Sequence, residues 1–452
     1  MERRTLLKTT AAAPAILRSR MGAASDRPNI LWILAEDIGP WFNCYGTSIV
    51  RTPNLDKLAA SGVRYTRAFT TAPVCSASRS AFNVGLYQIH TGAHHHRSHR
   101  KDGFTLPPHA RLISERMRDA GYFTCNVRQF APGMQGSGKT DYNFTVSKPW
   151  DGTHWNQRKE GQPFYAQVNF TEPHKGPAFV EARKQKDLID PAKVPLPPYF
   201  PDHPTVRDEV ANFYDAINLL DKKVGVLLET LDRDKVLDNT VVFMMGDNGT
   251  CLIRGKQWCY TKGVHVPMML RWPGVTKPGT VNEDLTLSLD MTATSLMAAG
   301  IPIPEQFHGT PLVGPKAKKR DHLFTARDRC DMTVDRIRSV RDKRYNFIRN
   351  FMPDRPYTQY NEYILKSYPT LTVMKQLHEQ GKLNATQQLF MAPRKPDVEL
   401  YDLQSDPHEV NNLAARPEHR KRVADMDRRL QAWLKQMDDK GAIPEKPEAA
   451  KL

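Results

Sequence analysis

The sequence predicts an α/β protein in which a large mixed, mostly parallel sheet is sandwiched by helices and followed by a smaller antiparallel sheet with a closing helix. In the first two thirds of the chain, continuous apolar runs alternate with amphipathic segments, as expected for a parallel sheet covered on both faces. In the last third, short apolar runs precede one long amphipathic segment. The length, 452 residues, suffices for a large core and a second domain.

The first part, residues 28–315, alternates between the two kinds of element. Its expected strands are 28–35, 63–70, 122–127, 164–170, 240–246 and 266–271, and its expected helices are 53–61, 77–84, 109–120, 208–231 and 288–299. Thr52 and Pro53 illustrate a predicted helix start, because a hydroxyl can cap the helix and proline is accepted in its first turn.

The second part is expected to span residues 316–440, after a basic surface connection that holds Lys316, Lys318, Lys319 and Arg320. Short strands are predicted within 322–326, 336–342, 344–350 and 398–403, and a closing amphipathic helix at 415–438. Residues 441–452 are expected to form a tail.

Residues 1–24 are interpreted as an export signal. Arg3 and Arg4 resemble a twin-arginine motif, a mildly apolar region follows, and the small residues Gly22, Ala23 and Ala24 offer a cleavage site. The twin-arginine export machinery is the expected partner, and a bacterial periplasmic or extracellular location is expected. No apolar run approaches the length needed to span a bilayer.

Charge and cysteine content limit the classes of substrate and of fold stabilisation that this chain can use. The net charge is +16, and removal of residues 1–24, with five basic residues and one acidic residue, would leave +12. This balance suits a polyanionic substrate, whereas no recognisable nucleic-acid-binding module is present. The six cysteines form no CxxC pair, so a disulfide scaffold is not required, although Cys251 and Cys259 could pair if the loop between them closes.

Two apolar strands end in pairs of oxygen donors. Glu36 and Asp37 follow the first expected strand, and Asp247 and Asn248 follow the strand 240–246. Ligand sites of open α/β sheets lie at the carboxyl ends of the strands, so the two pairs predict one site. Carboxylate and amide oxygens favour a hard divalent cation, most simply Ca²⁺, over zinc. Each pair alone is a weak signal, since Asp and Asn also favour turns.

The sequence Cys75-Ser76-Ala77-Ser78-Arg79 lies between an expected strand and an expected helix. Taken alone, it could be a small buried cysteine at a helix start. Together with PNILWILAEDIG, TPNLDKLAASGVRYTRAFT, the GDNG strand end and YDLQSDPHEVNNLA, in that order, it resembles the formylglycine-dependent sulfatases of the alkaline phosphatase superfamily. The resemblance spans about residues 28–433, and the segment VPLPPYFPDHPTVRDEVANFYDAI is most similar to the sulfamidase branch.

This resemblance implies a set of roles. Cys75 would be oxidised by a maturase to formylglycine, whose hydrate attacks sulfur beside a cation held by Glu36, Asp37, Asp247, Asn248 and the modified residue 75. Arg79 would orient and stabilise the hydrate. Lys256 would bind a sulfate oxygen, and His174 would help to protonate the leaving group, although a histidine there can also be a satisfied loop residue. The implied substrate is a sulfated oligosaccharide or glycosaminoglycan.

The chain departs from the family pattern in two places. Glu36 stands where the first metal carboxylate is usually an aspartate, so the coordination shifts or Asp37 acts alone on that strand. After AGYFT, the usual lysine and histidine are absent, and a glycine-rich stretch further on supplies Lys139 and Asp141. Lys139 is assigned as the sulfate-binding lysine, with Asp141 in place of the histidine; the alternative is a solvated loop.

Further candidates for substrate contact come from two segments. The histidine-rich loop with His94 and His95 is expected to line a sugar pocket rather than bind zinc, because consecutive residues point in different directions. Arg327 and Arg329 lie where the chain returns to the second part, and they are candidates to reach the cleft.

Two other functions stay open at this level. A phosphonate or phosphate ester hydrolase of the same superfamily would use the same modified cysteine and cation. A non-catalytic protein that binds sulfated sugars would explain Glu36 and the displaced Lys139. Intact Cys75, Arg79 and the paired acids argue against the second.

Overall fold

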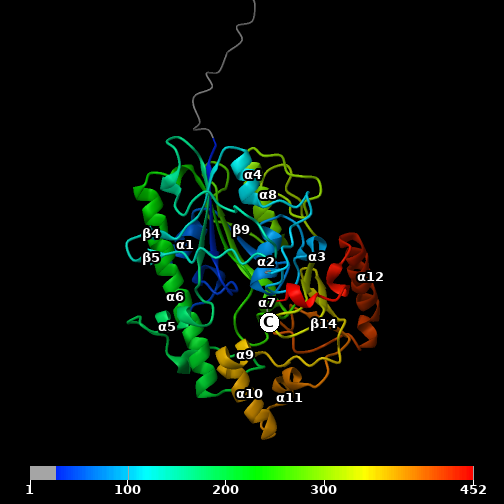
Figure 1. The fold of residues 1–452 in the computed structure, drawn as a ribbon. Helices are drawn as coiled ribbons and strands as arrows, with labels where there is room; N and C mark the ends of the chain where they lie inside the picture. The colour runs from blue at the N-terminus through cyan, green and yellow to red at the C-terminus, as the bar shows by residue number, and fades with distance from the viewer. Residues whose placement is uncertain (1–26, 100, 451–452) are drawn as a thin grey trace, which may run out of the picture.

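A computed structural model describes residues 27–99 and 101–450, and it has the architecture that the sequence predicts (Figure 1). The elements of the first part are β1 Asn29–Ala35, α1 Pro53–Ala60, β2 Val63–Phe69, α2 Cys75–Phe82, α3 Gln88–Thr91, α4 Ile113–Asp119, β3 Phe123–Asn126, β4 Gln129–Ala131, β5 Met134–Gln135, β6 Phe164–Phe170, α5 Pro177–Ala182, α6 Pro204–Arg233, β7 Thr240–Gly246, α7 Thr261–Val264, β8 His265–Arg271, β9 Thr280–Asn282, β10 Thr286–Leu287 and α8 Leu289–Ala298.

The large sheet has eight strands in the order β10-β2-β8-β7-β1-β6-β3, with β9 also paired to β2. Only β8 runs antiparallel to its neighbours in this sheet, so the sheet is mixed but mostly parallel. β1 lies at the centre between β6 and β7, and it pairs with both in parallel register. The carboxyl ends of these three strands therefore meet at one edge.

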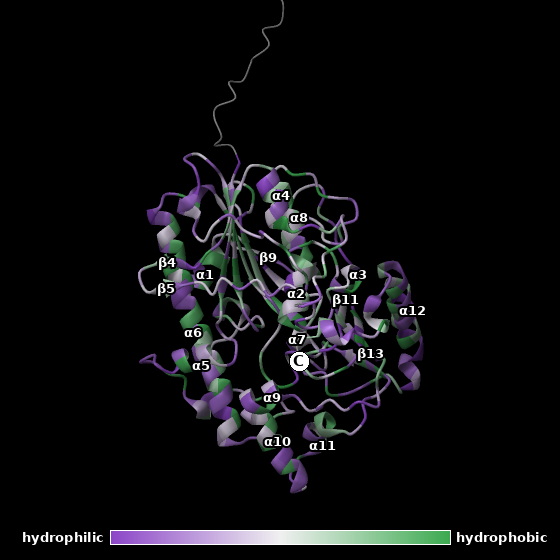
Figure 2. Ribbon diagram, viewed as in Figure 1, coloured by the Kyte–Doolittle hydropathy of each residue, from purple (hydrophilic) through white to green (hydrophobic). Residues whose placement is uncertain are grey.

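Helices cover both faces of this sheet (Figure 1). Successive side chains of a strand point to opposite faces. Leu31 and Ile33 of β1 accordingly join the core beneath α1 and α6, whereas Ile30 and Trp32 join the core beneath α2, α4 and α8. All seven residues of β1 are buried, which explains why the strand reads as a continuous apolar run. In Figure 2, α6 carries both apolar and polar residues, as expected for a helix with one face on the sheet.

The second part begins with an antiparallel sheet. Its strands are β11 Leu323–Arg327, β12 Ile337–Arg341, β13 Tyr345–Asn350 and β14 Val398–Asp402, and α12 Arg420–Met437 packs on it. The core residues of this layer, among them Val340, Phe347 and Trp433, belong to the same apolar cluster as Trp32. The two sheets thus share one core. The division of the chain at residue 315 stays a prediction.

The sequence analysis missed the segment between β13 and β14. Three helices lie there: α9 Glu362–Ser367, α10 Pro369–Glu379 and α11 Ala385–Gln388. α10 packs against α6 of the first part, and Leu371 and Met374 join the core below that helix. Short helices of this kind gain their stability from tertiary contacts rather than from a strong local signal.

Smaller differences concern helix starts and cysteines. Thr52 precedes α1 as expected, but the prediction that its hydroxyl caps the helix is wrong, because that oxygen accepts a bond from the backbone N–H of Asn43 instead (2.9 Å). The suggested pairing of Cys251 with Cys259 is also wrong: all six cysteines are free thiols. The predicted export signal lies outside the described residues. Among residues 27–99 and 101–450, no helix is both long and apolar enough to cross a membrane.

Candidate active site

The two acidic strand ends meet because β1 and β7 are paired, with Ala35 opposite Gly246. The Asp37 N–H donates to Asp247 Oδ1 (2.9 Å), and Asn248 Nδ2 donates to Asp37 Oδ1 (3.0 Å). Asp37 adopts a left-handed backbone (φ 54°), which turns the chain at the strand end. Asp37, Asp247 and Asn248 have no exposed surface.

Cys75 is the first residue of α2, and it faces this group of acids. Its Sγ lies 3.6 Å from Asp37 Oδ1, and its side chain is fully buried. Burial raises the pKa of the Cys75 thiol to about 12, although the charges of Lys139 and Lys256 oppose the shift. The unmodified thiol is therefore neutral at neutral pH and is a poor nucleophile.

Arg79 lies one turn further along α2, on the same face as Cys75. Its Nε donates to Asp247 Oδ2 (2.8 Å), and a second guanidinium nitrogen donates to Asn169 Oδ1 at the end of β6 (2.7 Å). Burial raises the pKa of Asp247, and the charge of Arg79 opposes this shift. Asn169 had no recognisable signal in the sequence, because it lies within a strand.

Lys256 and His174 complete the other side of the group. Lys256 Nζ donates to Asp37 Oδ2 (2.8 Å) and lies 3.2 Å from His174 Nε2. Burial alone would raise the pKa of Asp37, but the charges of Lys256 and His174 lower it below its ordinary value. Burial, together with the charge of Lys256, lowers the pKa of His174. The other ring nitrogen of His174 lies 2.7 Å from the Lys175 carbonyl oxygen, to which it can donate.

Lys139, from the glycine-rich insertion, also reaches the group. Its Nζ donates to Glu36 Oε2 (2.7 Å) and lies 3.6 Å from Asp141 Oδ2. Asp141 in turn faces Arg97, with 3.6 Å between Oδ1 and Nε. Glu36 and Asp141 are buried, whereas Lys139 and His174 keep about a fifth of their side-chain surface exposed and mark the open side of the site.

The donor set fits a hard divalent cation. Glu36, Asp37, Asp247 and Asn248 carry oxygen donors at two neighbouring strand ends, where Asp37 is hydrogen-bonded to Asp247 and Asn248. Asn248 Oδ1 is buried with no hydrogen-bond partner among the described residues. A buried carbonyl oxygen without a partner is costly unless an ion or water satisfies it. Ligand atoms of Glu36, Cys75 and His174 also lie within 4.8 Å of one another, a mixed set that zinc could use. The greater number of oxygen donors favours calcium.

His94 and His95, which the sequence predicted to contact the substrate, lie outside the group around Cys75. His94 is buried beside Asp328 and Arg338, and neither of its ring nitrogens has a hydrogen-bond partner in the described structure. His95 Nδ1 accepts from the Arg329 N–H (3.2 Å). Both residues line a cavity against the segment 440–449 rather than the space beside Cys75.

Arg327 and Arg329, which the sequence also predicted to reach the substrate, bond to residues outside the group around Cys75. Arg327 is buried and bonds to Asp335 (3.1 Å) and Thr333 (3.0 Å). Arg329 pairs with Glu445 of the C-terminal segment (2.9 Å). These contacts give both arginines a role in packing, and none of them leads to Cys75.

His96 and Asp331 contact residues that neighbour Cys75 and Lys256, and sequence reasoning missed them. His96 Nδ1 lies 2.8 Å from Ser76 Oγ, next to Cys75, and its Nε2 lies 3.4 Å from Asp331 Oδ1. Asp331 also accepts from Gln257 Nε2 (3.3 Å), beside Lys256. The only available signal was the run of three histidines, which does not show which of them faces inward.

The comparisons with known proteins agree with this geometry. The Sulfatase family model matches residues 28–301, and the model for the C-terminal part of N-sulphoglucosamine sulphohydrolase matches residues 252–391. An ulvan-active sulfatase of Formosa agariphila is 33% identical over 93% of this chain and 77% of its own length. Human N-sulphoglucosamine sulphohydrolase is 25% identical over 91% of both chains. The fold also matches a phosphonate monoester hydrolase of Agrobacterium radiobacter, with a TM-score of 0.67 and 17% identity over 91% of this chain and 96% of the other.

The fold, and the group in which acidic side chains, basic side chains and a cysteine lie together, define a hydrolase of the alkaline phosphatase superfamily. Within that superfamily, the chain belongs to the sulfatase family and carries the C-terminal part typical of N-sulphoglucosamine sulphohydrolase. The family assignment from the sequence is thereby confirmed.

Arg79 is expected to be essential for stability in the metal-free protein, because its removal leaves Asp247 buried without its counter-charge. Arg79→Met should lower the free energy of unfolding by about 3–5 kcal/mol in a chelating buffer. Arg79→Met/Asp247→Leu should recover much of this loss. Urea unfolding followed by circular dichroism measures both. Arg111→Met, which breaks an exposed pair with Asp119, is the control and should cost less than about 1 kcal/mol. A double variant no more stable than Arg79→Met would contradict this explanation.

Proposed function

We propose that this sulfatase removes sulfate from a sulfated glycan with a formylglycine formed at Cys75 and a divalent cation held by Glu36, Asp37, Asp247 and Asn248. The observation that carries the proposal is the position of Cys75. Its sulfur faces Asp37 at 3.6 Å within a buried group of acids, and Arg79, Lys139 and Lys256 surround that group.

The formylglycine hydrate would supply the nucleophile, and the cation would hold it and polarise a sulfate oxygen. The residues of the chain prepare this chemistry. Arg79 is fixed by Asp247 and Asn169, so its charge is held next to position 75. Lys256 and Lys139 each present an ammonium group to the acids and can bind the sulfate oxygens of a substrate.

Proton supply to the leaving group is assigned to His174. This imidazole lies on the open side of the site, and its Nε2 is within hydrogen-bond distance of the Lys256 ammonium group. In the neutral ring, Nδ1 donates to the Lys175 carbonyl oxygen and Nε2 accepts from Lys256. A proton passed from the Lys256 ammonium group to Nε2 would face the space beside Cys75 and Glu36, where a leaving oxygen or nitrogen must depart.

A sulfated oligosaccharide or glycosaminoglycan is the substrate class that we propose. Two relatives support it by name, the ulvan-active sulfatase and N-sulphoglucosamine sulphohydrolase. The net charge of +16 suits a polyanionic chain. Within this class, the match to the C-terminal sulphohydrolase model favours an N-sulfated glucosamine at a non-reducing end. A phosphonate or phosphate ester hydrolase shares the fold, and the substrate panel below tests it.

The proposal also requires two partners in the cell. Cys75 is fully buried and needs a formylglycine-generating maturase, and residues 1–24 would direct the protein through the twin-arginine machinery to the periplasm or the exterior.

Cys75 is expected to be converted to formylglycine when the protein is produced together with a maturase. Peptide mass spectrometry should show the aldehyde at position 75, and Cys75→Ala should lower activity by roughly 10³-fold or more because the nucleophile is lost. Cys44→Ala, which alters a half-buried thiol outside the site, should leave activity unchanged. Full activity with an intact thiol, or in Cys75→Ala, would disprove the assignment.

One divalent cation, most simply calcium, is expected per chain. Asp247→Ala should lose the metal and the activity together, with a fall in metal affinity beyond the roughly 10- to 100-fold typical for loss of an outer partner. Elemental analysis of the purified protein checks this. Asp238→Ala, at an exposed position, is the control. Stoichiometric zinc without calcium would instead indicate the mixed set of Glu36, Cys75 and His174.

The role of His174 is expected to depend on the leaving group. The nitrogen or alkoxide oxygen that departs from sulfur needs a proton to leave. His174→Ala should therefore slow the hydrolysis of a natural glycan sulfate by about 10²–10⁴-fold. An aryl sulfate, whose phenolate leaves easily, should be slowed far less. Equal losses on both substrates would remove the acid role.

The same assay should cover N-sulfated glucosamine, 6-O-sulfated glucosamine, ulvan fragments and a phosphonate monoester. Turnover of O-sulfates without the N-sulfate would end the N-sulfate assignment and leave the sulfatase intact. A preference for the phosphonate monoester would overturn the proposed substrate class.

A further inference from the structure

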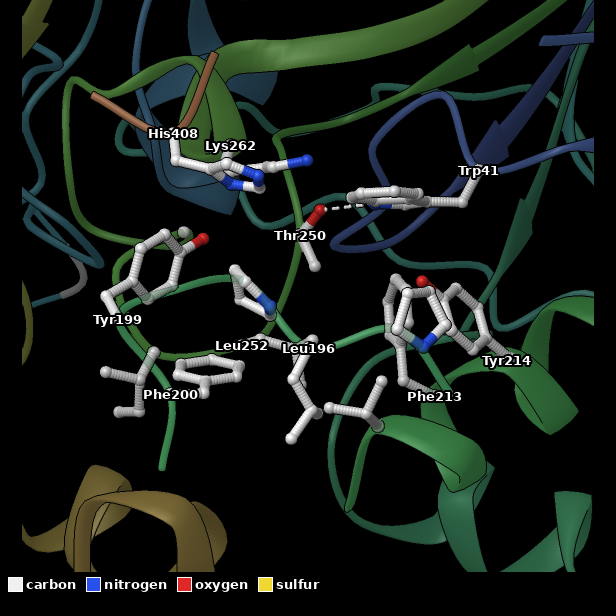
Figure 3. A pocket seen from close by; sticks show the side chains of 15 residues that line it. Trp41, Leu196, Tyr199, Phe200, Phe213, Tyr214, Thr250, Leu252, Lys262 and His408 are labelled. Atoms are coloured by element: carbon white, nitrogen blue, oxygen red, sulfur yellow. Dashed lines mark hydrogen bonds between the residues drawn. The ribbon is translucent and has the colours of Figure 1, made fainter. Parts of the chain in front are cut away.

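A separate cavity lies behind the loop that carries Lys256. Its volume is about 230 Å³, and it is bounded by Trp41, by the segment 195–200, by α6, by the loop 250–255, by Lys262 and by His408 (Figure 3). Among the described residues that line it, none belongs to the group around Cys75. The loop connects this cavity with the group around Cys75. The Lys256 N–H donates to the Thr250 carbonyl oxygen (2.8 Å), and Thr250 lines the cavity.

The walls of this cavity are mainly apolar and aromatic. Leu196, Phe200, Phe213 and Leu252 form much of the lining, and the Thr250 hydroxyl already accepts a bond from Trp41 Nε1 (2.7 Å). A sugar ring would leave most of its hydroxyl groups without partners here, at considerable cost. A cavity of about 150 Å³ is known to hold benzene. The space therefore fits an apolar ring with one substituent.

Lys262 gives the cavity a positive charge. Its Nζ lies 3.9 Å from the centre of the Trp41 ring, and Lys262 forms no ion pair with a carboxylate among the described residues. The Lys262 side chain is half-buried. Burial lowers the pKa of Lys262 to about 8, and Glu409 opposes the shift only in part. An ammonium group that lies over an aromatic ring at the edge of an apolar cavity is the counterpart of an anionic ligand.

His408 places a nitrogen atom without a hydrogen-bond partner in the described structure at the same end of the cavity. Its Nδ1 is buried without a hydrogen-bond partner among the described residues. Figure 3 shows His408 and Lys262 at one end of the pocket, with Phe200, Leu196 and Leu252 toward the other. Burial and then the charge of Lys262 lower the pKa of His408, so its imidazole is neutral at pH 7 and can donate from Nδ1 in one tautomer.

We propose that this cavity binds a small aromatic monoanion, namely a monocarboxylate with one aromatic ring, such as an arylacetate. Its carboxylate would accept hydrogen bonds from Lys262 Nζ and His408 Nδ1, and its ring would lie among Phe200, Phe213 and Leu252. The ligand is distinct from the sulfated glycan and binds on the reverse side of the loop 250–256. This inference does not depend on the proposed function, because binding is measured without turnover.

Phenylacetate is the probe for a test by isothermal calorimetry and saturation-transfer NMR at pH 7. Phenylacetate should bind, whereas acetate, which lacks the ring, and phenylacetamide, which lacks the charge, should bind at least about tenfold more weakly. Lys262→Met keeps the length of the side chain and should weaken phenylacetate binding by about tenfold or more. Lys193→Met, at an exposed lysine just before the lining segment, should leave binding unchanged.

The unaltered protein provides a test that needs no variant. Phenylacetate affinity should fall by about tenfold between pH 7 and pH 9 as Lys262 loses its proton. Glu409 and His408 are the titratable groups near Lys262, and Arg254 and Asp406 lie near His408. Lys262→Met should show little of this dependence. Undiminished binding to folded Lys262→Met, acetate binding as tightly as phenylacetate, or absence of phenylacetate binding would overturn the proposal.

Discussion

The neutralisation of buried acids is the constraint on which the rest of this structure depends. Glu36, Asp37 and Asp247 lie together at strand ends with almost no access to water. Carboxylates so placed repel one another and lack hydration, so they require cations at short range. Arg79, Lys139 and Lys256 supply them, each within 2.8 Å of a carboxylate oxygen. Because each cation comes from a different segment, the charges fix the helix α2, the glycine-rich insertion and the loop after β7 relative to the sheet.

The order of the central strands makes this arrangement possible. β1 lies between β6 and β7, and the three strands deliver Asp37, Asn169 and Asp247 to one edge. All three strands are fully buried, and the second sheet extends the same core on one side. The polar site is thus held by a rigid apolar support, which is the condition for fixed distances between reacting groups.

The loop after β7 presents two lysines to opposite environments. Lys256 faces Asp37, which keeps the pKa of this lysine well above its ordinary value despite burial. Lys262 lies over Trp41 beside an apolar cavity, where burial lowers the pKa. Lys256 is therefore paired with a carboxylate, whereas the half-buried Lys262 lies over an aromatic ring. Lys256 suits the stable binding of a sulfate oxygen, and Lys262 suits a ligand that brings its own negative charge.

The sequence alone determined the fold class, most of the strands and the two acidic strand ends. Buried strands appear in the sequence as continuous apolar runs, and the strand-end acids follow two of these runs directly. It also determined the family, through the segment around Cys75 together with the other matching segments that run in the same order along the chain. Only the tertiary structure decided which distant side chains complete the site. Lys139 reaches Glu36 across 103 positions, and His96 rather than His94 or His95 turns toward Ser76. Such choices depend on how loops close over the sheet, since the direction of a side chain on an irregular segment is set by its packing partners and not by its own sequence.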